Sequence, residues 1–188
     1  MRKLLVFNNV TLDGYFADPK GDISWAHRAP QDEEFKAFVA ENAGGGGQLM
    51  FGRITYQMMV QYWPTPMAKQ NDPKIAEGMN RMSKVVFSRT LDNVSWENTT
   101  LLKGDLATEV RRLKQESGKD MVILGSGSLV AQLTQAELID GYQIMVNPVI
   151  LGNGRTMFDG MKKQVALKLA QTRAFKNGNV LLTYERAS

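Results

Sequence analysis

The chain has 188 residues, 43% of them hydrophobic, and its 23 basic and 19 acidic residues give a net charge of +4. A domain of this size can bury a real core, no apolar stretch approaches the length of a membrane span, and the mild, scattered positive charge argues against a nucleic-acid binder. With no cysteine and a single histidine, His27, the chain has no disulfide, no thiolate nucleophile and too few ligands for an ordinary zinc site. We expect one cytoplasmic domain over residues 1–188, with no metal, membrane or nucleic-acid partner, and with His27 on a loop or at the surface.

The first third of the chain predicts a strand, a long loop and a helix. Residues 3–10 are apolar and continuous enough for a central strand, which ends in an Asp-Gly turn. Residues 16–30 form a long loop around Trp25, and loops of this length in compact domains are often binding lids. Residues 31–34 then open a helix with acidic side chains in its first turn, which the helix dipole favours.

The middle of the chain alternates strands and helices. Four glycines at residues 44–47 form a flexible joint rather than a domain boundary, because a strand follows them at once. We expect strands at residues 49–51, 84–87 and 94–96, and helices at residues 56–62, 74–82 and 105–116.

The last third ends in an antiparallel tail. We expect strands at residues 121–124 and 142–150, a helix from residue 129, and a hairpin with strands at 165–175 and 180–184. The hairpin is closed by an Asn-Gly pair, which is a strong short-range hairpin signal. The sequence therefore predicts an α/β fold whose mixed sheet is mainly parallel in the middle.

A turn of small residues lies between the strand at 121–124 and the following helix: Gly125, Ser126, Gly127 and Ser128. Backbone N–H groups at such a helix start attract phosphate, and the alternative is a plain turn that needs glycine for packing. The turn lacks the third glycine of a dinucleotide fingerprint, the G-x-S-x-G pattern of serine hydrolases and the Gly-Lys-Ser/Thr of a P-loop. A phosphate site here belongs to some other nucleotide-binding fold.

Two other predicted strand ends carry residues that suit phosphate. One is Gly52, Arg53 and Thr55, which combine close approach, charge and a hydroxyl at a helix start, and the other is Ser88 and Arg89. Each arginine taken alone fits a surface ion pair equally well. Because ligands in open α/β sheets bind beyond the carboxyl ends of strands, the shared position favours a ligand with several phosphates, such as a dinucleotide with an extra 2′-phosphate.

In these motifs and their order, the chain resembles dihydrofolate reductases, and more closely the bacterial branch related to the reductase domain of riboflavin biosynthesis. The matching stretches are residues 11–17, 51–56, 86–89 and 123–154, and they span essentially the whole chain. The resemblance implies a three-layer dihydrofolate reductase-like fold with a central sheet of about eight strands. It also implies NADPH bound across the sheet and a homodimer.

The resemblance assigns cofactor contacts to the three strand ends. It implies that the cofactor phosphates lie at Gly52, Arg53 and Thr55, and the phosphate on the adenosine at Ser88 and Arg89. It implies that the pyrophosphate lies at the turn made by Gly125, Ser126, Gly127 and Ser128.

Two features of dihydrofolate reductases are compared with this chain: the glycine pair of the turn and the pterin anchor. Those enzymes have two adjacent glycines joined by a cis peptide at the turn, whereas the second position here is Ser126. They also anchor the pterin with a carboxylate on the first helix, where this chain offers Asp32, Glu33 and Glu34. These three also fit a plain helix start matched to the helix dipole, so no pterin anchor is assigned.

Three residues near the first strand are candidates for the reaction site. We expect Asp13 to be the polar catalytic group near the nicotinamide, because it follows the first strand beside the expected site. The alternative for Asp13 is a simple Asp-Gly turn. We expect Tyr15 and Trp25 to line the substrate pocket, and Trp25 fits equally well a role in pinning its loop to the core.

These patterns lead to a hypothesis and an alternative. The hypothesis is an NADPH-dependent reductase that transfers hydride to a small heterocyclic or carbonyl substrate. The alternative is a module that binds NADP or an antifolate without turnover.

Overall fold

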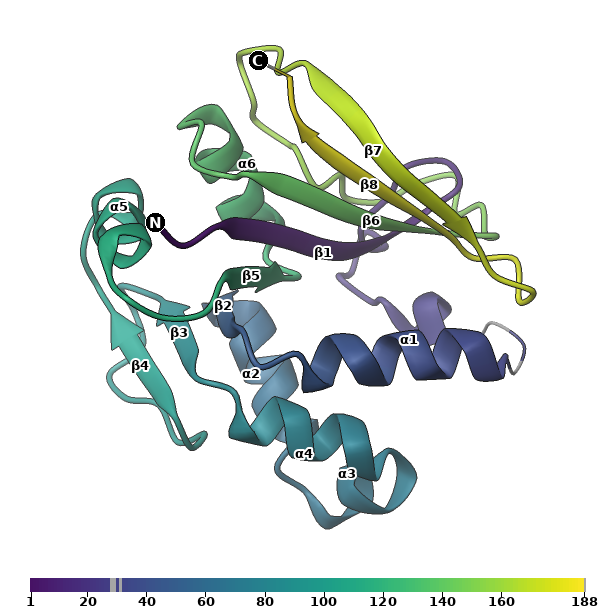
Figure 1. Cartoon of the computed structure of the whole chain (residues 1–188), viewed down its shortest axis with the longest axis horizontal. Helices are drawn as coiled ribbons and strands as arrows, with labels where there is room; N and C mark the ends of the chain where they lie inside the picture. The colour runs from purple at the N-terminus through teal and green to yellow at the C-terminus, as the bar shows by residue number, and fades with distance from the viewer. Residues whose placement is uncertain (28–29, 31, 188) are drawn as a thin grey trace.

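An eight-stranded sheet organises the chain in a computed structural model that describes residues 1–27, 30 and 32–187 (Figure 1). The spatial order is β4-β3-β2-β5-β1-β6-β8-β7, parallel from β4 to β6 and antiparallel in the final β8 and β7. The strands are β1 Leu4–Thr11, β2 Gln48–Gly52, β3 Lys84–Phe87, β4 Thr99–Leu102, β5 Met121–Leu124, β6 Gly141–Asn147, β7 Leu167–Ala174 and β8 Val180–Arg186. The predicted fold class, a mixed and mainly parallel sheet with an antiparallel C-terminal hairpin, is confirmed.

Helices cover both faces of this sheet. They are η1 Ser24–His27, a short 3₁₀ helix, and the α-helices α1 Glu33–Gly44, α2 Arg53–Tyr62, α3 Pro66–Asn71, α4 Pro73–Arg81, α5 Leu106–Gln115 and α6 Gly127–Gln135. None of the helices in the described ranges is long and apolar enough to cross a bilayer.

Alternating side chains on the strands assign each helix to a face. Met50 of β2 and Ile123 of β5 lie in one core cluster with residues of α5 and α6. Their neighbours Phe51 and Leu124 point the other way and pack in a second cluster with residues of α2 and α4. Helix α1 covers the continuation of this second face over β1, β6 and β8. The result is a helix–sheet–helix arrangement of three layers.

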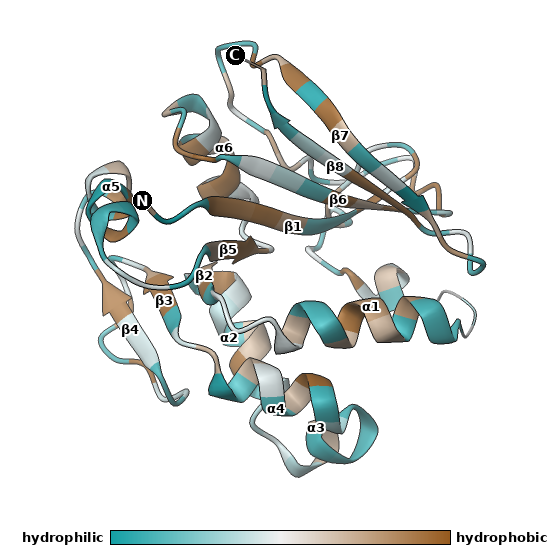
Figure 2. Ribbon diagram, in the orientation of Figure 1, coloured by the Kyte–Doolittle hydropathy of each residue, from teal (hydrophilic) through white to brown (hydrophobic). Residues whose placement is uncertain are grey.

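The path of the chain creates a crevice in the middle of the sheet. Strand β5 pairs with both β1 and β2, although it follows both in sequence. The helices that follow the neighbouring strands β2 and β5 pack on opposite faces, since α2 and α6 belong to different clusters. Ligands of open α/β sheets bind at such a switch point, beyond the carboxyl ends of the strands. In Figure 2 strand β5 and the first part of β1 are brown, whereas β1 turns teal toward its carboxyl end.

The strand expected at residues 94–96 is wrong, because the strand at this sheet edge is β4, which starts at Thr99. The backbone N–H groups of Ser95 and Trp96 donate to the hydroxyl of Tyr56, at 2.9 and 3.2 Å, instead of to a neighbouring strand. The Trp96 ring is buried and stacks on Phe51. A large side chain held by the core thus takes the chain out of the sheet at this point.

Other differences from the sequence prediction concern element ends. The helix expected at residues 74–82 is present as α4, and α3 precedes it without having been predicted. The N-cap of α1 is Asp32, and Gln31, expected to open this helix, lies outside the described residues. The strand expected to run to residue 150 ends at Asn147.

Candidate functional site

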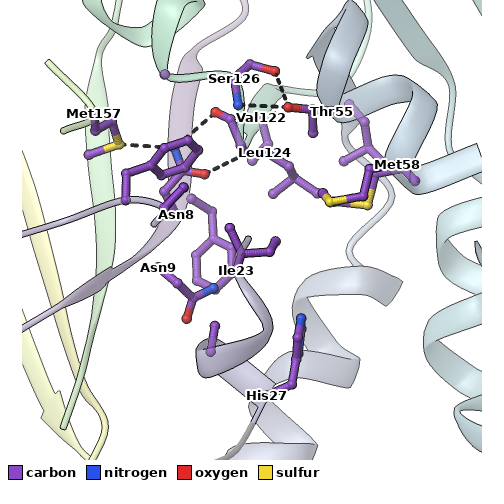
Figure 3. Close-up of a pocket in the computed structure, with 18 of the residues that line it drawn as sticks. Asn8, Asn9, Ile23, His27, Thr55, Met58, Val122, Leu124, Ser126 and Met157 are labelled. Carbon is purple, nitrogen blue, oxygen red and sulfur yellow. Dashed lines mark hydrogen bonds between the residues drawn. The ribbon is translucent and has the colours of Figure 1, made fainter. Parts of the chain in front are cut away.

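A large cleft opens at the switch point. Its volume is about 1880 Å³, and it is lined by β1, β2 and β5, by α2, α4 and the start of α6, by η1 and α1, and by residues 154–157 and 159. Figure 3 shows part of this pocket, with Thr55, Ser126 and Met58 at one end and Asn9, Ile23 and His27 toward the other.

The turn after β5 takes an unusual backbone path that requires glycine. Gly125 and Ser126 both have left-handed φ values, 62° and 55°, and the described residues contain no cis peptide. A Cβ on residue 125 would lie 2.8 Å from Cγ2 of Thr55, so no other residue fits. The side chain of Asn8 on β1 holds the turn by accepting a hydrogen bond from the Gly125 N–H and donating one to the Gly125 carbonyl.

A hydroxyl network joins this turn to the end of β2. The backbone N–H and the hydroxyl of Ser126 donate to Oγ1 of Thr55, at 3.0 and 2.9 Å. The N–H of Gly52 donates to Oγ of Ser126 at 2.7 Å (Figure 3 shows the Ser126–Thr55 pair). Residues 71 to 74 positions apart in the sequence are thereby held in one rigid unit.

The network leaves two helix N-termini facing the cleft. Gly52 is the N-cap of α2 and Ser126 the N-cap of α6, and neither helix has a side-chain cap hydrogen bond. The free N–H groups of a first helical turn carry partial positive charge and bind anions. Gly52, Thr55 and the turn at 125–128 all line the cleft.

Arg53 adds a full positive charge to this end of the cleft. It is the first residue of α2, lines the cleft and is exposed, with Nη1 donating to Gln57 at 3.2 Å. Among the described residues it forms no ion pair with a carboxylate. The structure therefore brings together all the sequence-predicted cofactor residues of two strand ends.

The third strand end lies apart. Phe87, the last residue of β3, lines the cleft, but Ser88 and Arg89 do not. The hydroxyl of Ser88 accepts hydrogen bonds from the N–H groups of Thr90 and Leu91 and so closes a turn. Arg89 is exposed near Asp105, where, after the hydrogen bonds from Thr108, its charge helps to lower the pKa of the Asp105 carboxyl.

Asp13 lies outside the cleft lining and joins two loops. Its carboxylate accepts hydrogen bonds from the Thr11 hydroxyl at 2.6 Å, the Leu151 N–H at 3.1 Å and the Gly152 N–H at 2.7 Å. The Thr11 hydroxyl is the main cause of a lowered pKa of Asp13, and the Gly152 and Leu151 N–H groups add to it. The structure does not bring this sequence candidate to the other site residues.

The aromatic candidates also lie outside the lining. Tyr15 packs against Gly154, where an added Cβ would come within 2.9 Å of the ring. Trp25 is buried in η1, and its indole N–H has no partner among the described residues. Its burial fits the expectation that it pins its loop to the core. His27, at the end of η1, is exposed and lines the cleft.

Asp32 is the acidic residue of the α1 start that lines the cleft, while Glu33 and Glu34 are exposed on the helix. Its Oδ1 accepts from the N–H groups of Glu34 and Phe35, at 3.0 and 3.2 Å, and its Oδ2 from the N–H of Asn177 at 3.1 Å. Burial opposes ionisation of this carboxylate, but the donated hydrogen bonds outweigh it and lower the pKa of Asp32. The carboxylate thus caps α1 and ties it to the β7–β8 turn.

Sequence reasoning gave no role to the two asparagines that build this site. Asn8 and Asn9 follow the apolar run of residues 4–7 in strand β1, and both line the cleft. Adjacent carboxamides in a central strand were the available signal, because polar side chains buried there need partners.

These features define an α/β protein of the dihydrofolate reductase-like fold, with a cleft at its switch point suited to an anionic ligand. The chain belongs to the RibD C-terminal domain family, whose model matches residues 2–181. YyaP of Bacillus subtilis, described as uncharacterized, is 27% identical over 97% of this chain and 94% of its own length.

Two solved structures share the fold at low sequence identity. The deaminase/5-amino-6-(5-phosphoribosylamino)uracil reductase of Thermotoga maritima superposes with a TM-score of 0.68 at 14% identity, over 99% of this chain and 57% of that one. Dihydrofolate reductase of Enterococcus faecalis, complexed with NADP(H), gives a TM-score of 0.65 at 14% identity, over 99% and 97%. The family resemblance inferred from the motifs is confirmed.

Proposed function

We propose that this protein is an NADPH-dependent reductase that transfers hydride to a small heterocyclic or carbonyl substrate. The observation that carries the proposal is the pair of uncapped helix N-termini, α2 and α6, locked side by side by Thr55 and Ser126 on the cleft wall. A pyrophosphate needs several N–H donors and a cation at close range. The starts of α2 and α6 with Arg53, here called the phosphate corner, supply both.

The residues present fit the cofactor. Gly125 lets the turn pack tightly against Thr55, and the first-turn N–H groups at Gly127 and Ser128 would hold the pyrophosphate beside Arg53. NADPH, when bound, supplies the hydride. Ser88 and Arg89, at the end of β3 and next to the lining residue Phe87, are proposed to hold the 2′-phosphate.

The chain's own part in the reaction is orientation and exclusion of water. Phe7, Phe35 and Val39 form an apolar wall of the cleft beyond the phosphate corner. The lowered pKa values of Asp13 and Asp32 keep both carboxylates ionised near neutral pH, so in this proposal neither donates a proton. Asp13 instead positions the loop that leaves β1 against the loop after β6.

Titration with NADPH and NADH, followed by tryptophan fluorescence, tests the proposal. We expect NADPH to bind more tightly than NADH, and Arg53→Gln to weaken both by about tenfold. Equal binding of the two nucleotides would contradict the 2′-phosphate role, and no binding of either would contradict the function.

The alternative, a binding module without turnover, predicts a different result. NADPH would bind, but no pterin, flavin precursor or carbonyl compound would cause its oxidation.

We also propose a homodimer, a small-molecule substrate and a cytoplasmic location. Sedimentation at several protein concentrations tests the homodimer.

A further inference from the structure

The two adjacent asparagines of β1, Asn8 and Asn9, point to opposite faces of the sheet and form different contacts. Asn8 holds the turn at Gly125. Asn9 follows it in the strand, so its side chain lies on the face that carries Phe7 and α1. Figure 3 places Asn9 at the end of the pocket near Ile23 and His27, away from Thr55 and Ser126.

The orientation of the Asn9 amide is fixed by Asn147 on the neighbouring strand β6. The Asn147 side chain is 1% exposed, and its Nδ2 donates to the carbonyls of Met145 and Val10, at 3.1 and 3.3 Å. Carbonyls only accept hydrogen bonds, so they oblige Asn147 to face this way. The same nitrogen also lies 3.1 Å from Oδ1 of Asn9, so its two N–H groups are shared among three acceptors. Asn9 therefore gives its oxygen to Asn147 and keeps its own N–H groups for the cleft.

Among the other polar groups at this end of the cleft, Asn177 is also an oriented amide, because its Oδ1 accepts from the N–H of Asn179 at 3.0 Å while its Nδ2 has no partner among the described residues. Both oxygens of Asp32 accept backbone hydrogen bonds, and Lys36 pairs with Glu33 at 3.1 Å. The Gln143 side chain lines the cleft and forms no hydrogen bond with a described residue, so either end of its amide can face a ligand. No described residue accepts from Nδ2 of Asn9. The Asn9 amide differs in that it stands on the strand wall of the cleft beside Phe7, where an oriented donor can select a ligand by its acceptor group.

We propose that Asn9 is the specificity-determining donor of the substrate pocket, that it binds a carbonyl oxygen of the substrate, and that Asn147 positions it. This inference rests on the proposed reductase function and narrows its substrate class to neutral rings that carry a carbonyl group. A ring that carries an amino group at the same point would place donor against donor and would be rejected.

Two matched probes test this inference: 6-aminouracil, which carries two ring carbonyls, and 2,4,6-triaminopyrimidine, which carries amino groups in their place. Binding of each to the ¹⁵N-labelled full-length chain is measured by NMR at pH 8, with and without NADPH. We expect the wild type to prefer 6-aminouracil by at least about tenfold, as sites built to hydrogen-bond a substrate group do. The side-chain amide signal of Asn9, identified by its loss in Asn9→Leu, should shift as this probe binds.

Variants separate recognition from folding. Asn9→Asp replaces the donor with an acceptor and should reverse the preference, whereas Asn42→Asp makes the same change at an exposed cleft position on α1 and should leave it unchanged. Asn147→Leu should lower the affinity for 6-aminouracil and the preference together, because Asn9 loses its fixed direction. NADPH affinity should stay within about twofold in all of them, since the phosphate corner is untouched.

The outcomes distinguish this inference from the proposed function. An unchanged preference in Asn9→Asp, the same change in Asn42→Asp, or no binding of 6-aminouracil to a wild type that binds NADPH overturns the role of Asn9. A wild type that fails to bind NADPH but discriminates the probes through Asn9 removes the cofactor proposal and keeps this inference.

Discussion

The two ends of the cleft are built in different ways. At the phosphate corner, glycines and hydroxyls lock the backbone of two helix starts, so that the ligand would meet mainly N–H groups and Arg53. At the substrate end, the walls are side chains of β1, η1 and α1, and the approach is bordered by the long loop that follows β1. The first end suits a ligand with a constant charged part, while the second can change its selectivity through single side chains.

The largest expected effect comes from the locked corner. Gly125→Ala places a Cβ against Thr55 in a left-handed backbone, and should weaken NADPH by about a hundredfold. Gly160→Ala is the matched control, because Gly160 has φ +80° and open space around it. Equal losses in the two variants, measured by fluorescence titration, would show that the packing against Thr55 is irrelevant to binding.

Arg89, which follows the cleft residue Phe87 and lies outside the cleft lining, tests the proposed site of the 2′-phosphate. Arg89→Ala should weaken NADPH by about tenfold and NADH by less than about twofold, because only NADPH carries the 2′-phosphate. The ratio of the two dissociation constants is the measurement. If the dissociation constants of NADPH and NADH rise by the same factor, Arg89 acts through its long-range charge and not through a contact with the 2′-phosphate. The assignment of the 2′-phosphate to this strand end then fails.

The hydroxyl of Thr55 should matter less than the shape of the turn. Thr55→Val keeps the branched side chain but leaves the buried N–H and hydroxyl of Ser126 without their acceptor, which costs about 1–3 kcal/mol in unfolding free energy. NADPH affinity should fall by about tenfold as the two helix starts loosen. Thr100→Val, on the exposed edge strand β4, is the control for loss of a threonine hydroxyl and should change neither quantity.

The smallest effect on the cofactor is expected at the substrate end. Asp32→Ala removes the α1 cap and its link to Asn177, and should lower Tm by about 5 °C with NADPH affinity unchanged. Glu33→Ala, which removes an exposed neighbour, should leave Tm within about 1 °C.

The effect of Asp32 should depend on pH in a defined direction. A carboxyl whose pKa is lowered by folding adds stability above its ordinary value of 3.8 and loses that contribution as pH falls through the folded value. The Tm difference between wild type and Asp32→Ala should therefore be full at pH 6 and shrink below pH 3.8. A difference that grows with acid would contradict the role of Asp32 as an ionised cap.

The phosphate corner was the more predictable end, because its signals are local. Gly52, Arg53 and the turn at 125–128 each stand at a strand-to-helix junction, and the sequence shows both the junctions and the small residues. Because the carboxyl ends of parallel strands lie at one edge of a sheet, the sequence also predicted that these junctions lie close together. The lock between Thr55 and Ser126 could not be derived, because it depends on a contact between residues 71 positions apart.

The substrate end was less predictable for the same physical reason. The link from Asp32 to Asn177 spans 145 positions, and the one from Asn147 to Asn9 spans 138. Asp13 was predicted as a site residue because it follows the central strand. Hydrogen bonds from the N–H groups of Leu151 and Gly152 direct its carboxylate to the loop after β6, whose position the sequence does not predict. Local patterns give the type of residue, and tertiary hydrogen bonds decide where it points.

A crystal structure of the protein grown with NADPH tests the central claim most directly. We predict that the pyrophosphate oxygens accept hydrogen bonds from the first-turn N–H groups of both α2 and α6, with the Arg53 guanidinium beside them. A cofactor whose pyrophosphate lies elsewhere, or touches only one of the two helix starts, would contradict the account.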